Sequence, residues 1–455
     1  MRKVLIANRG EIACRVMRSC KNLGIATVAV HSEADAGALH VALADEAVAI
    51  GASPPAQSYL VAQRVLEAAR STGADAIHPG YGFLSENADF ATAVHRAGIT
   101  WIGPDPKTIE DMGDKERARL LAKAAGVPIL PGSARFSTGD FAGMPAAGVE
   151  VGFPLLVKAA AGGGGIGMRR VDRAEDLAAA VEATQSMAQR AFGDGAVYLE
   201  RLVAEARHVE VQVFGFGDGR AVHLFERDCS IQRRFQKVVE ESPAPAISDA
   251  TRTAMFEAAL ALCRQERYRG AGTIEFILDA DTGKFYFLEM NTRIQVEHPV
   301  TEMNTGRDLV AMQILLAAGM ALPVENQDDV RQTGHAIECR IYSERPAKNF
   351  LPSPGTLARL VLPPASPHLR VDTGVREGDR ITPFYDPMIA KIITHGGDRA
   401  DAITRMAQAL DDTRIEGLET NLAFLRNVLR HPAFGAGLVR TNFIERHRAE
   451  LLAPA

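Results

Sequence analysis

GTIEFILDADTGKFYFLEMNTRIQVE, residues 272–297, contains two strand-like runs on either side of a turn signal. From Phe285 onward apolar and polar residues alternate, and a period of two predicts an extended strand with one buried face. The preceding run, 273–278, is rich in β-branched and aromatic residues, and Asp281-Thr282-Gly283 is typical of a turn. We therefore predict a β-hairpin closed by a three-residue loop.

A hairpin centred on Thr282 places Glu275 opposite Glu289, with their Cβ atoms roughly 5 Å apart. Two facing carboxylates repel each other, so one must take up a proton unless a cation lies between them. A divalent metal ion bound by Glu275, Glu289 and Asn291 is the simplest solution. A solvated edge strand without a metal is the alternative interpretation.

Composition narrows the class of protein. The 455 residues are 47% apolar and 24% charged, typical of a globular chain of about three domains. A formal charge of -5 does not favour a nucleic-acid-binding protein. The five cysteines have no metal-binding spacing, and the longest apolar run, 309–322, is shorter than a membrane span. The basic start, MRKVLIANRG, has too short an apolar stretch for a signal peptide. We expect a cytoplasmic protein without a membrane partner.

The first hundred residues predict a parallel α/β sheet. Apolar runs at 3–7 and 27–31 flank a helical pattern at 11–22, which is a βαβ unit. No GxGxxG motif occurs there, so a dinucleotide site is not expected. HPGYGFLSEN, residues 78–87, follows a strand that begins near Ala74. This loop is either functional, because ligands gather at strand ends, or a plain connection.

A strand predicted at 153–158 leads directly into AAAGGGGIGM, residues 159–168. Consecutive glycines can direct several backbone N–H groups at an anion, and Lys158 adds a positive charge. The spacing differs from the Walker A motif. Phosphate binding is the favoured interpretation, and a flexible linker is the alternative.

Two further segments carry charged groups. SIQRRFQKVVEE, residues 230–241, holds three basic residues between predicted strands, which indicates either an anion site or a solvated charge run. GHAIECRIYSE, residues 334–344, alternates, with Ile337 predicted inward and Arg340 outward. The chain after 331 therefore predicts an α+β part whose Arg340 can extend toward the active face.

Seven motifs together resemble the biotin carboxylase family of the ATP-grasp superfamily: IANRGEIA, HPGYGFLSEN, the glycine loop, ERDCSIQRR, QKVVEE, EMNTRIQVEHPVTE and GHAIECRI. The resemblance extends nearly from end to end and implies a fold that is α/β and α+β. It implies an N-terminal parallel α/β domain at 1–113, an ATP-grasp domain at 114–330 with a mobile lid at about 131–203, and a C-terminal domain at 331–455.

The resemblance also implies ATP- and bicarbonate-dependent carboxylation of biotin N1′ through carboxyphosphate, the first half-reaction of an acetyl-CoA or acyl-CoA carboxylase. The residues implied for ATP are Lys115, Lys158, Gly163, Gly164, Gly165, Glu200, Leu202, His208 and Gln232. Those implied for bicarbonate and biotin are Lys237, Arg293, Gln295, Val296 and Arg340, with Glu297 as general base and Arg340 facing carboxyphosphate and biotin. The metal ligands implied are Glu275, Glu289 and Asn291, in agreement with the hairpin argument.

The implied cofactors are ATP and Mg²⁺ or Mn²⁺, with biotin as a carrier-bound substrate. The implied partners are a biotin carboxyl carrier protein or domain, a carboxyltransferase and a second copy of the chain, with Arg15, paired with Glu11 on the first helix, at the dimer contact. No Met-Lys-Met sequence occurs, so we expect the carrier on a separate chain or segment.

The sequence departs from the family pattern at Phe235, Ile166 and Ala161. The last two give the loop AGGGGIGM, which resembles the loops of urea carboxylase and some acyl-CoA carboxylases. A urea carboxylase-type component, an ATP-grasp carboxylate–amine ligase and a non-enzymatic nucleotide-binding subunit are the alternatives. QKVVEE and ECRI argue against the ligase, and the joint presence of Lys237, Arg293, Glu297 and Arg340 argues against the non-enzymatic subunit.

Overall fold

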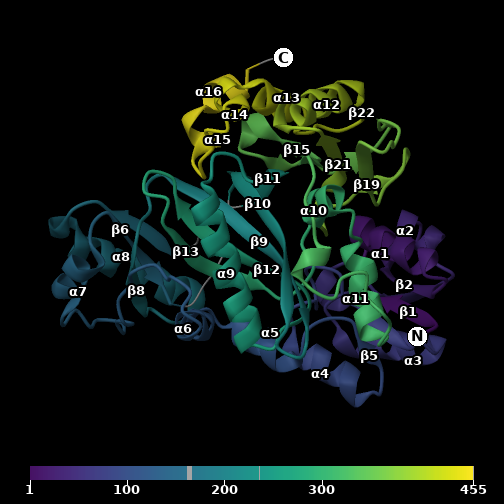
Figure 1. The fold of residues 1–455 in the computed structure, drawn as a ribbon, viewed down its shortest axis with the longest axis horizontal. Coiled ribbons are helices and arrows are strands. Elements are labelled where there is room, and N and C mark those ends of the chain that lie inside the picture. The colour runs from purple at the N-terminus through teal and green to yellow at the C-terminus, as the bar shows by residue number, and fades with distance from the viewer. Residues whose placement is uncertain (161–166, 235, 454–455) are drawn as a thin grey trace.

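The N-terminal part is a parallel sheet covered by helices, as predicted. In the computed structural model, which describes residues 1–160, 167–234 and 236–453, it forms one side of the molecule (Figure 1). The strands are β1 (Lys3–Ile6), β2 (Ala26–Ser32), β3 (Glu46–Gly51), β4 (Ala76–His78) and β5 (Thr100–Trp101), in the order β3-β2-β1-β4-β5. The helices are α1 (Gly10–Asn22), α2 (Leu39–Leu43), α3 (Ala62–Thr72), α4 (Ala88–Arg96) and α5 (Pro106–Gly113). Every pairing in this sheet is parallel, which confirms the prediction from the βαβ pattern.

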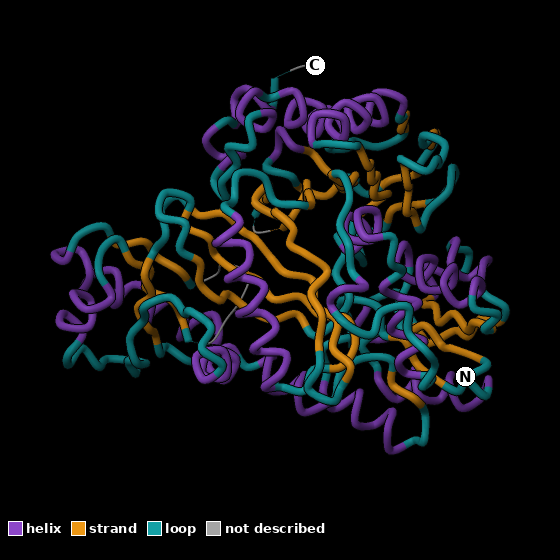
Figure 2. Tube along the Cα trace, viewed as in Figure 1, coloured by secondary structure: helices purple, strands orange, loops and turns teal. Residues whose placement is uncertain are grey.

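The centre of the molecule is an eight-stranded antiparallel sheet, in the order β13-β12-β9-β10-β11-β14-β21-β19. Its strands are β9 (Ala206–Phe216), β10 (Ala221–Arg233), β11 (Gln236–Ser242), β12 (Arg269–Asp279), β13 (Phe285–Asn291), β14 (His335–Tyr342), β19 (Leu369–Thr373) and β21 (Met388–Gly396). Because β11 pairs with β14, this sheet continues across the predicted boundary at 330. The antiparallel sheet extends through the middle of the molecule (Figure 2), so the α+β character of the C-terminal part is confirmed.

Helices pack on the central sheet and, near the C-terminus, on one another. They are α9 (Asp249–Gln265), α10 (His298–Thr305), α11 (Leu309–Ala317), α12 (Arg399–Asp412), α13 (Leu422–Arg430), α14 (Pro432–Gly435), α15 (Phe443–Arg446) and α16 (Arg448–Leu451). Short strands complete the C-terminal part: β15 (Glu344–Arg345), β16 (Leu351–Pro352), β17 (Gly355–Thr356), β18 (Arg359–Val361), β20 (Arg380–Ile381) and β22 (Arg414–Glu416). None of the helices in the described ranges combines the length and the apolar character that crossing a membrane requires.

β14 contacts α10 and α12 as well as its neighbouring strands, so the outward face predicted from its alternation is not solvated. All eight residues of the strand are buried, including Glu338, Arg340 and Tyr342. The alternation therefore separates two buried environments, one apolar and one charged.

A separate lobe lies at one end of the molecule (Figure 1) and corresponds to the predicted lid. It contains the antiparallel sheet β7-β6-β8, made of β6 (Leu155–Ala159), β7 (Met168–Val171) and β8 (Val197–Arg201), together with α7 (Met144–Val151) and α8 (Leu177–Phe192). The lobe has its own apolar core, in which Leu155, Val157, Val181 and Leu199 are buried. The glycine-loop residues Ala161, Gly163, Gly164, Gly165 and Ile166 lie outside the described residues, as does Phe235.

The hairpin of β12 and β13 has the predicted register at its functional end, where Glu275 faces Glu289. A register shift follows Glu275, and the loop is four residues long, Ala280–Gly283, because Asp279 bonds to Lys284 across it. The predicted three-residue loop is therefore wrong. The predicted strand is also too long, because β13 ends at Asn291.

The chain leaves β13 because other groups bind the next residues. Glu86 accepts hydrogen bonds from the Thr292 backbone N–H at 3.2 Å and from the Arg293 guanidinium at 2.8 Å. Residues 292–297 thus form a loop that leads into α10, and Glu297 lies at the start of this helix. The alternation predicts that the polar side chains of these residues lie along one face of a strand. That prediction is wrong, because the residues belong to a loop.

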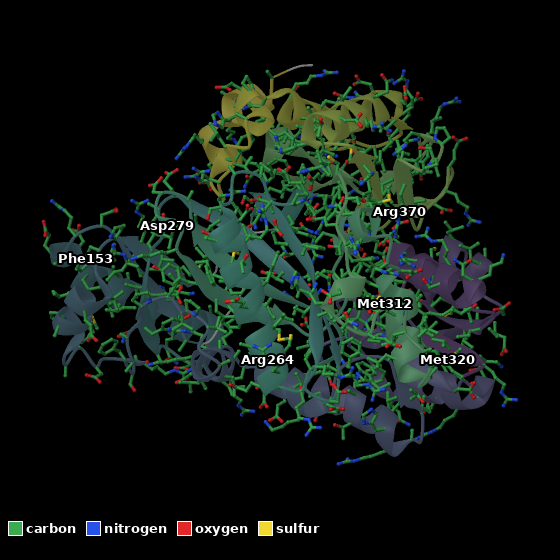
Figure 3. All side chains as sticks on the ribbon, in the orientation of Figure 1. Phe153, Arg264, Asp279, Met312, Met320 and Arg370 are labelled. Atoms are coloured by element: carbon green, nitrogen blue, oxygen red, sulfur yellow. The ribbon has the colours of Figure 1, made fainter. Side chains whose placement is uncertain are left out.

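The junction between the C-terminal and N-terminal parts is an ion-pair network. Arg370 on β19, labelled in Figure 3, lies between these parts and donates to Glu302 on α10 at 2.6 Å. Arg15 on α1 donates to the same carboxylate at 2.8 Å and to Asp308 at 2.7 Å. The predicted pairing of Arg15 with Glu11 is therefore wrong, and the Arg15 side chain is only 2% exposed.

Candidate active site

A cavity of about 1210 Å³ lies where the N-terminal sheet, the lid lobe and the central sheet meet. Thirteen residues proposed for the site from the sequence line it: Lys115, Lys158, His208, Gln232, Lys237, Glu275, Glu289, Asn291, Arg293, Gln295, Val296, Glu297 and Arg340. Glu200 and Leu202 are not among its lining residues. The structure thus brings together side chains from β9, β10, β11, β12, β13, β14 and the segment at 292–297 with two lysines from outside the central sheet.

Lys237 on β11 is the centre of the charged cluster. Its ammonium group donates to Glu210 at 2.5 Å, Glu297 at 2.6 Å and Glu275 at 2.8 Å. Burial opposes the charged form of Lys237, but these three carboxylates raise its pKa well above its ordinary value. The cluster is stable only as a unit, because a buried charge without a partner is costly.

Glu297 lies between two cations. Lys237 contacts one of its carboxylate oxygens, and Arg340 donates to the other at 2.8 Å. Burial alone would raise the pKa of Glu297, but Lys237, Arg340 and Arg227 hold it well below its ordinary value. The side chain is therefore an anion that a bound ligand can reach, since both it and Arg340 line the cavity.

The facing carboxylates differ in their surroundings. Glu275 accepts from Lys237, Asn291 and Gln295 and lies 2.8 Å from His208 Nε2. Burial opposes ionisation of Glu275, but Lys237 and His208 lower its pKa far below its ordinary value.

Within the part of the chain that the structure describes, no cation forms an ion pair with Glu289, and burial together with the neighbouring Glu275 raises its pKa. Two carboxylates and the amide oxygen of Asn291 form a hard, oxygen-rich donor set that suits Mg²⁺ or Mn²⁺. A divalent ion would relieve the repulsion between the facing carboxylates of Glu275 and Glu289, so these residues fit the metal implied by the sequence.

The loop at 78–87 contributes to the site through Glu86. This carboxylate holds Arg293, which in turn donates to Asn291 at 2.8 Å. Tyr81 also lines the cavity and donates to Glu11 at 2.7 Å. The loop is therefore more than a plain connection, whereas His78 is fully buried under it.

The end of the cavity beside the lid lobe holds the more accessible lysines: Lys115 is exposed, and the Lys158 side chain is 20% exposed. Lys158 lines the cavity and donates to Glu200 at 2.7 Å, whereas the Glu200 carboxylate does not line it. The Leu202 backbone bonds to the Pro154 carbonyl within the lobe. His208 Nδ1 and Gln232 Nε2 lie 2.7 Å apart, so these two residues, both implied for ATP by the resemblance, are in direct contact.

Comparisons with known proteins decide the family. Residues 1–109 match the model of the biotin carboxylase N-terminal domain, 114–325 that of the carbamoyl-phosphate synthase L chain ATP-binding domain, and 338–446 that of the biotin carboxylase C-terminal domain. Biotin carboxylase 1 of Bacillus subtilis is 49% identical, and the match covers 98% of this chain and 99% of that protein. The chain belongs to the biotin carboxylase family.

Longer relatives and a solved structure agree with this assignment. The mitochondrial methylcrotonoyl-CoA carboxylase subunit alpha of Dictyostelium discoideum is 50% identical over 99% of this chain and 64% of its own length. The chain spans 61% to 64% of the length of the first relatives of that name. The biotin carboxylase domain dimer of Hydrogenobacter thermophilus 2-oxoglutarate carboxylase, solved with MgADP, ADP and bicarbonate, superimposes with a TM-score of 0.92. It is 45% identical, and the match covers 100% of this chain and 99% of that one.

Family motifs and residue types alone did not indicate every group that supports the site. Glu210 and Arg227 are fully buried, and Arg227 donates to Glu210 at 2.6 Å. The alternation of β9, which places Glu210 on the same face as His208, was a signal for the first of these. Arg227 lies in the ERDCSIQRR motif, but neither the motif nor its residue type indicated its contact with Glu210, because that contact forms between strands.

The basic segment at 230–241 divides between two environments. Lys237 enters the cavity, Arg233 pairs with Glu344, and Arg234 is exposed. The solvated-charge interpretation therefore applies to Arg234, and the anion-site interpretation applies to Lys237. Of the three basic residues, only Lys237 is placed to meet an anion in the cavity.

Proposed function

We propose that this chain is a biotin carboxylase that uses ATP and bicarbonate to carboxylate biotin N1′ on a carrier protein. The observation that carries the proposal is the position of Glu297 between Lys237 and Arg340 in the cavity that the facing Glu275 and Glu289 also line. A carboxylate base, a bicarbonate-binding cation and a pair of metal-binding carboxylates are the groups that this chemistry requires at one place.

ATP would bind at the open end of the cavity. Lys115 and Lys158 carry the charge that the phosphates need, with Gly163, Gly164 and Gly165 in the connecting loop, Glu200 and Leu202 on the adenine side, and His208 and Gln232 on the ribose side. Glu275, Glu289 and Asn291 would hold Mg²⁺ or Mn²⁺, which neutralises charge on the phosphates when bound. Closure of the lid at about 131–203 would exclude water from the unstable intermediate.

Bicarbonate would bind between Lys237, Arg293, Gln295 and Val296, within reach of Glu297. A bicarbonate ion that shares the Lys237 ammonium weakens the contact that now lowers the Glu297 pKa, which makes Glu297 a better base. Glu297 then takes the bicarbonate proton as the bicarbonate oxygen attacks the γ-phosphorus, and ADP leaves.

The resulting carboxyphosphate divides into CO₂ and phosphate. The phosphate accepts the N1′ proton of biotin, and N1′ attacks CO₂ to give carboxybiotin. Arg340 faces the cavity from β14 and would stabilise the negative charge that develops on the ureido oxygen of biotin.

The proposal extends to organisation and partners. We place the domains at 1–113, 114–330 and 331–455, and we expect a biotin carboxyl carrier protein, a carboxyltransferase and a homodimer as the working assembly. Arg15 contributes little surface to such a dimer, because its side chain is buried by its own chain. We place the protein in the cytoplasm.

Release of ADP by the purified chain tests the proposal. With ATP, Mg²⁺ and bicarbonate present, free biotin should increase the rate of ADP release, and omission of bicarbonate should abolish the increase. ADP release that is indifferent to both biotin and bicarbonate would contradict a biotin carboxylase.

A further inference from the structure

Two buried carboxylates lie directly behind Arg340. Glu240 on β11 and Glu338 on β14 face each other across the two paired strands, and both are 0% exposed. Side chains of directly opposite residues in an antiparallel pair have Cβ atoms about 5 Å apart. The sequence and the proposed reaction assign neither residue a role.

The cations around this pair are too few for two full charges. Arg340 lies 2.5 Å from Glu240, but the same guanidinium also serves Glu297 at 2.8 Å and is 4.0 Å from Glu338. The Lys391 ammonium donates to the Val296 carbonyl at 2.7 Å instead. Arg340 is thus the donor that contacts Glu240, whereas no donor among the described residues makes a hydrogen bond to either carboxylate oxygen of Glu338.

We propose that Glu240 and Glu338 share a single proton, so that the pair carries one negative charge and positions the Arg340 guanidinium against Glu297. The proton supplies the hydrogen bond that the surrounding groups do not, because a protonated carboxyl group is a donor. Glu240 and Glu338 are positioning residues, and their effect on turnover rests on the function proposed above.

The electrostatic surroundings agree with one retained proton. Burial raises the pKa of Glu240 to about 7, against the opposing effect of Arg340. Burial, opposed by Lys391 and reinforced by Glu240, raises the pKa of Glu338 well above its ordinary value. The other titratable groups nearby are Glu297, Lys237, Cys229, Cys339 and His298, and burial favours the neutral form of the last three.

The shared proton has a consequence for pH. When it is lost, a second negative charge appears 4.0 Å from the Arg340 Nε and draws the guanidinium away from Glu297. Biotin-dependent turnover therefore falls on the alkaline side. The free energy of unfolding also falls as the pH rises above 4.5. Over this range the unfolded chain releases the carboxyl proton, whereas the folded chain, with its raised carboxyl pKa, still binds it.

The test compares Glu338→Gln, Glu240→Gln, the double variant and Glu241→Gln. Each single variant of the pair keeps one charge and one side-chain donor, whereas the double variant has no charge. Glu241 is the matched control: it is buried on the same strand but bonds to His335 at 2.8 Å and to Arg399 at 2.6 Å. Burial opposes its ionisation, but these partners lower its pKa.

The first readout is the infrared band of a protonated carboxylic acid, in difference spectra against wild type at neutral pH. We expect either single substitution in the pair to remove one such band and Glu241→Gln to remove none. Glu338→Gln should also flatten the decline in melting temperature between about pH 5 and pH 8. An unchanged band in both single variants would overturn the proposal.

The second readout is kcat/KM for biotin against pH. We expect Glu338→Gln to extend activity to higher pH, and the double variant to lose about tenfold, the effect of one charge-assisted hydrogen bond. An alkaline limb that does not move in Glu338→Gln would overturn the positioning role. If wild type shows the band but no biotin-dependent ADP release, the proposed function fails and the shared proton stands.

Discussion

The two ends of the cavity hold their lysines differently. At the end beside the lid lobe, where we propose that ATP binds, Lys115 is exposed, and the Lys158 side chain is 20% exposed with one carboxylate partner, Glu200. At the end where we propose that bicarbonate binds, Lys237 contacts three carboxylates, and Glu297 is fully buried between two cations. Lys115 and Lys158 therefore have positive charge available to a ligand. In contrast, Lys237 and Glu297 each form ion pairs with more than one charged side chain.

This difference follows from where each end is built. Lys158 lies on β6 in the lid lobe, which has a separate apolar core. Lys237 lies on β11, inside the sheet that joins the central and C-terminal parts. A substitution at the open end should therefore affect ligand binding alone, and one at the buried end should affect folding and chemistry together.

The largest effect is expected for Lys237→Met. Loss of the ammonium leaves Glu210, Glu275 and Glu297 buried without their shared partner, which should lower the free energy of unfolding by about 3–5 kcal/mol. The loss should increase from pH 5 to pH 8, because protonation relieves the repulsion at low pH. Denaturant titration at both pH values measures it, with Lys115→Met as the control at the open end. A loss in Lys237→Met no larger than in the control would show that the cluster does not act as a unit.

Glu297→Gln should separate chemistry from nucleotide binding. We expect bicarbonate-dependent ADP release to fall by about 10²- to 10⁴-fold, the range for loss of a general base. The dissociation constant for ATP should stay near that of wild type, because the nucleotide end has its own lysines. Steady-state kinetics and calorimetry measure the two quantities, and an equal loss in both would indicate that Glu297 is structural.

A smaller effect is expected for Glu289→Gln, which leaves the facing pair with one charge. The Mg²⁺ concentration for half-maximal ADP release should rise by roughly tenfold or more, while saturating Mg²⁺ restores much of the rate. Asp281→Asn is the matched control, because Asp281 is an exposed carboxylate in the turn of the same hairpin. A magnesium titration that coincides with that of the control would contradict metal binding by the facing carboxylates.

The sequence was sufficient where local spacing determines geometry. Period-two alternation and a turn signal placed Glu275 opposite Glu289, and the βαβ pattern indicated the parallel N-terminal sheet. It was insufficient where contacts are distant in sequence. The end of β13 at Asn291 depends on Glu86, more than 200 residues away, and the burial of Glu338 depends on helices on both faces of β14. No short-range pattern contains either contact.

The smallest effect on stability is expected for Lys158→Met. The Lys158 side chain is 20% exposed and has one carboxylate partner where Lys237 has three, so its loss should lower the free energy of unfolding by much less than the loss in Lys237→Met. The KM for ATP should rise by about tenfold, because a charge-assisted contact to phosphate is lost. Arg170→Met on the adjacent strand β7 is the control, since its partner Asp172 lies outside the cavity. If Lys158→Met instead destabilised the fold as much as Lys237→Met, the lid lobe would share the interlocked charges of the buried end, and the two ends of the cavity would not be independent.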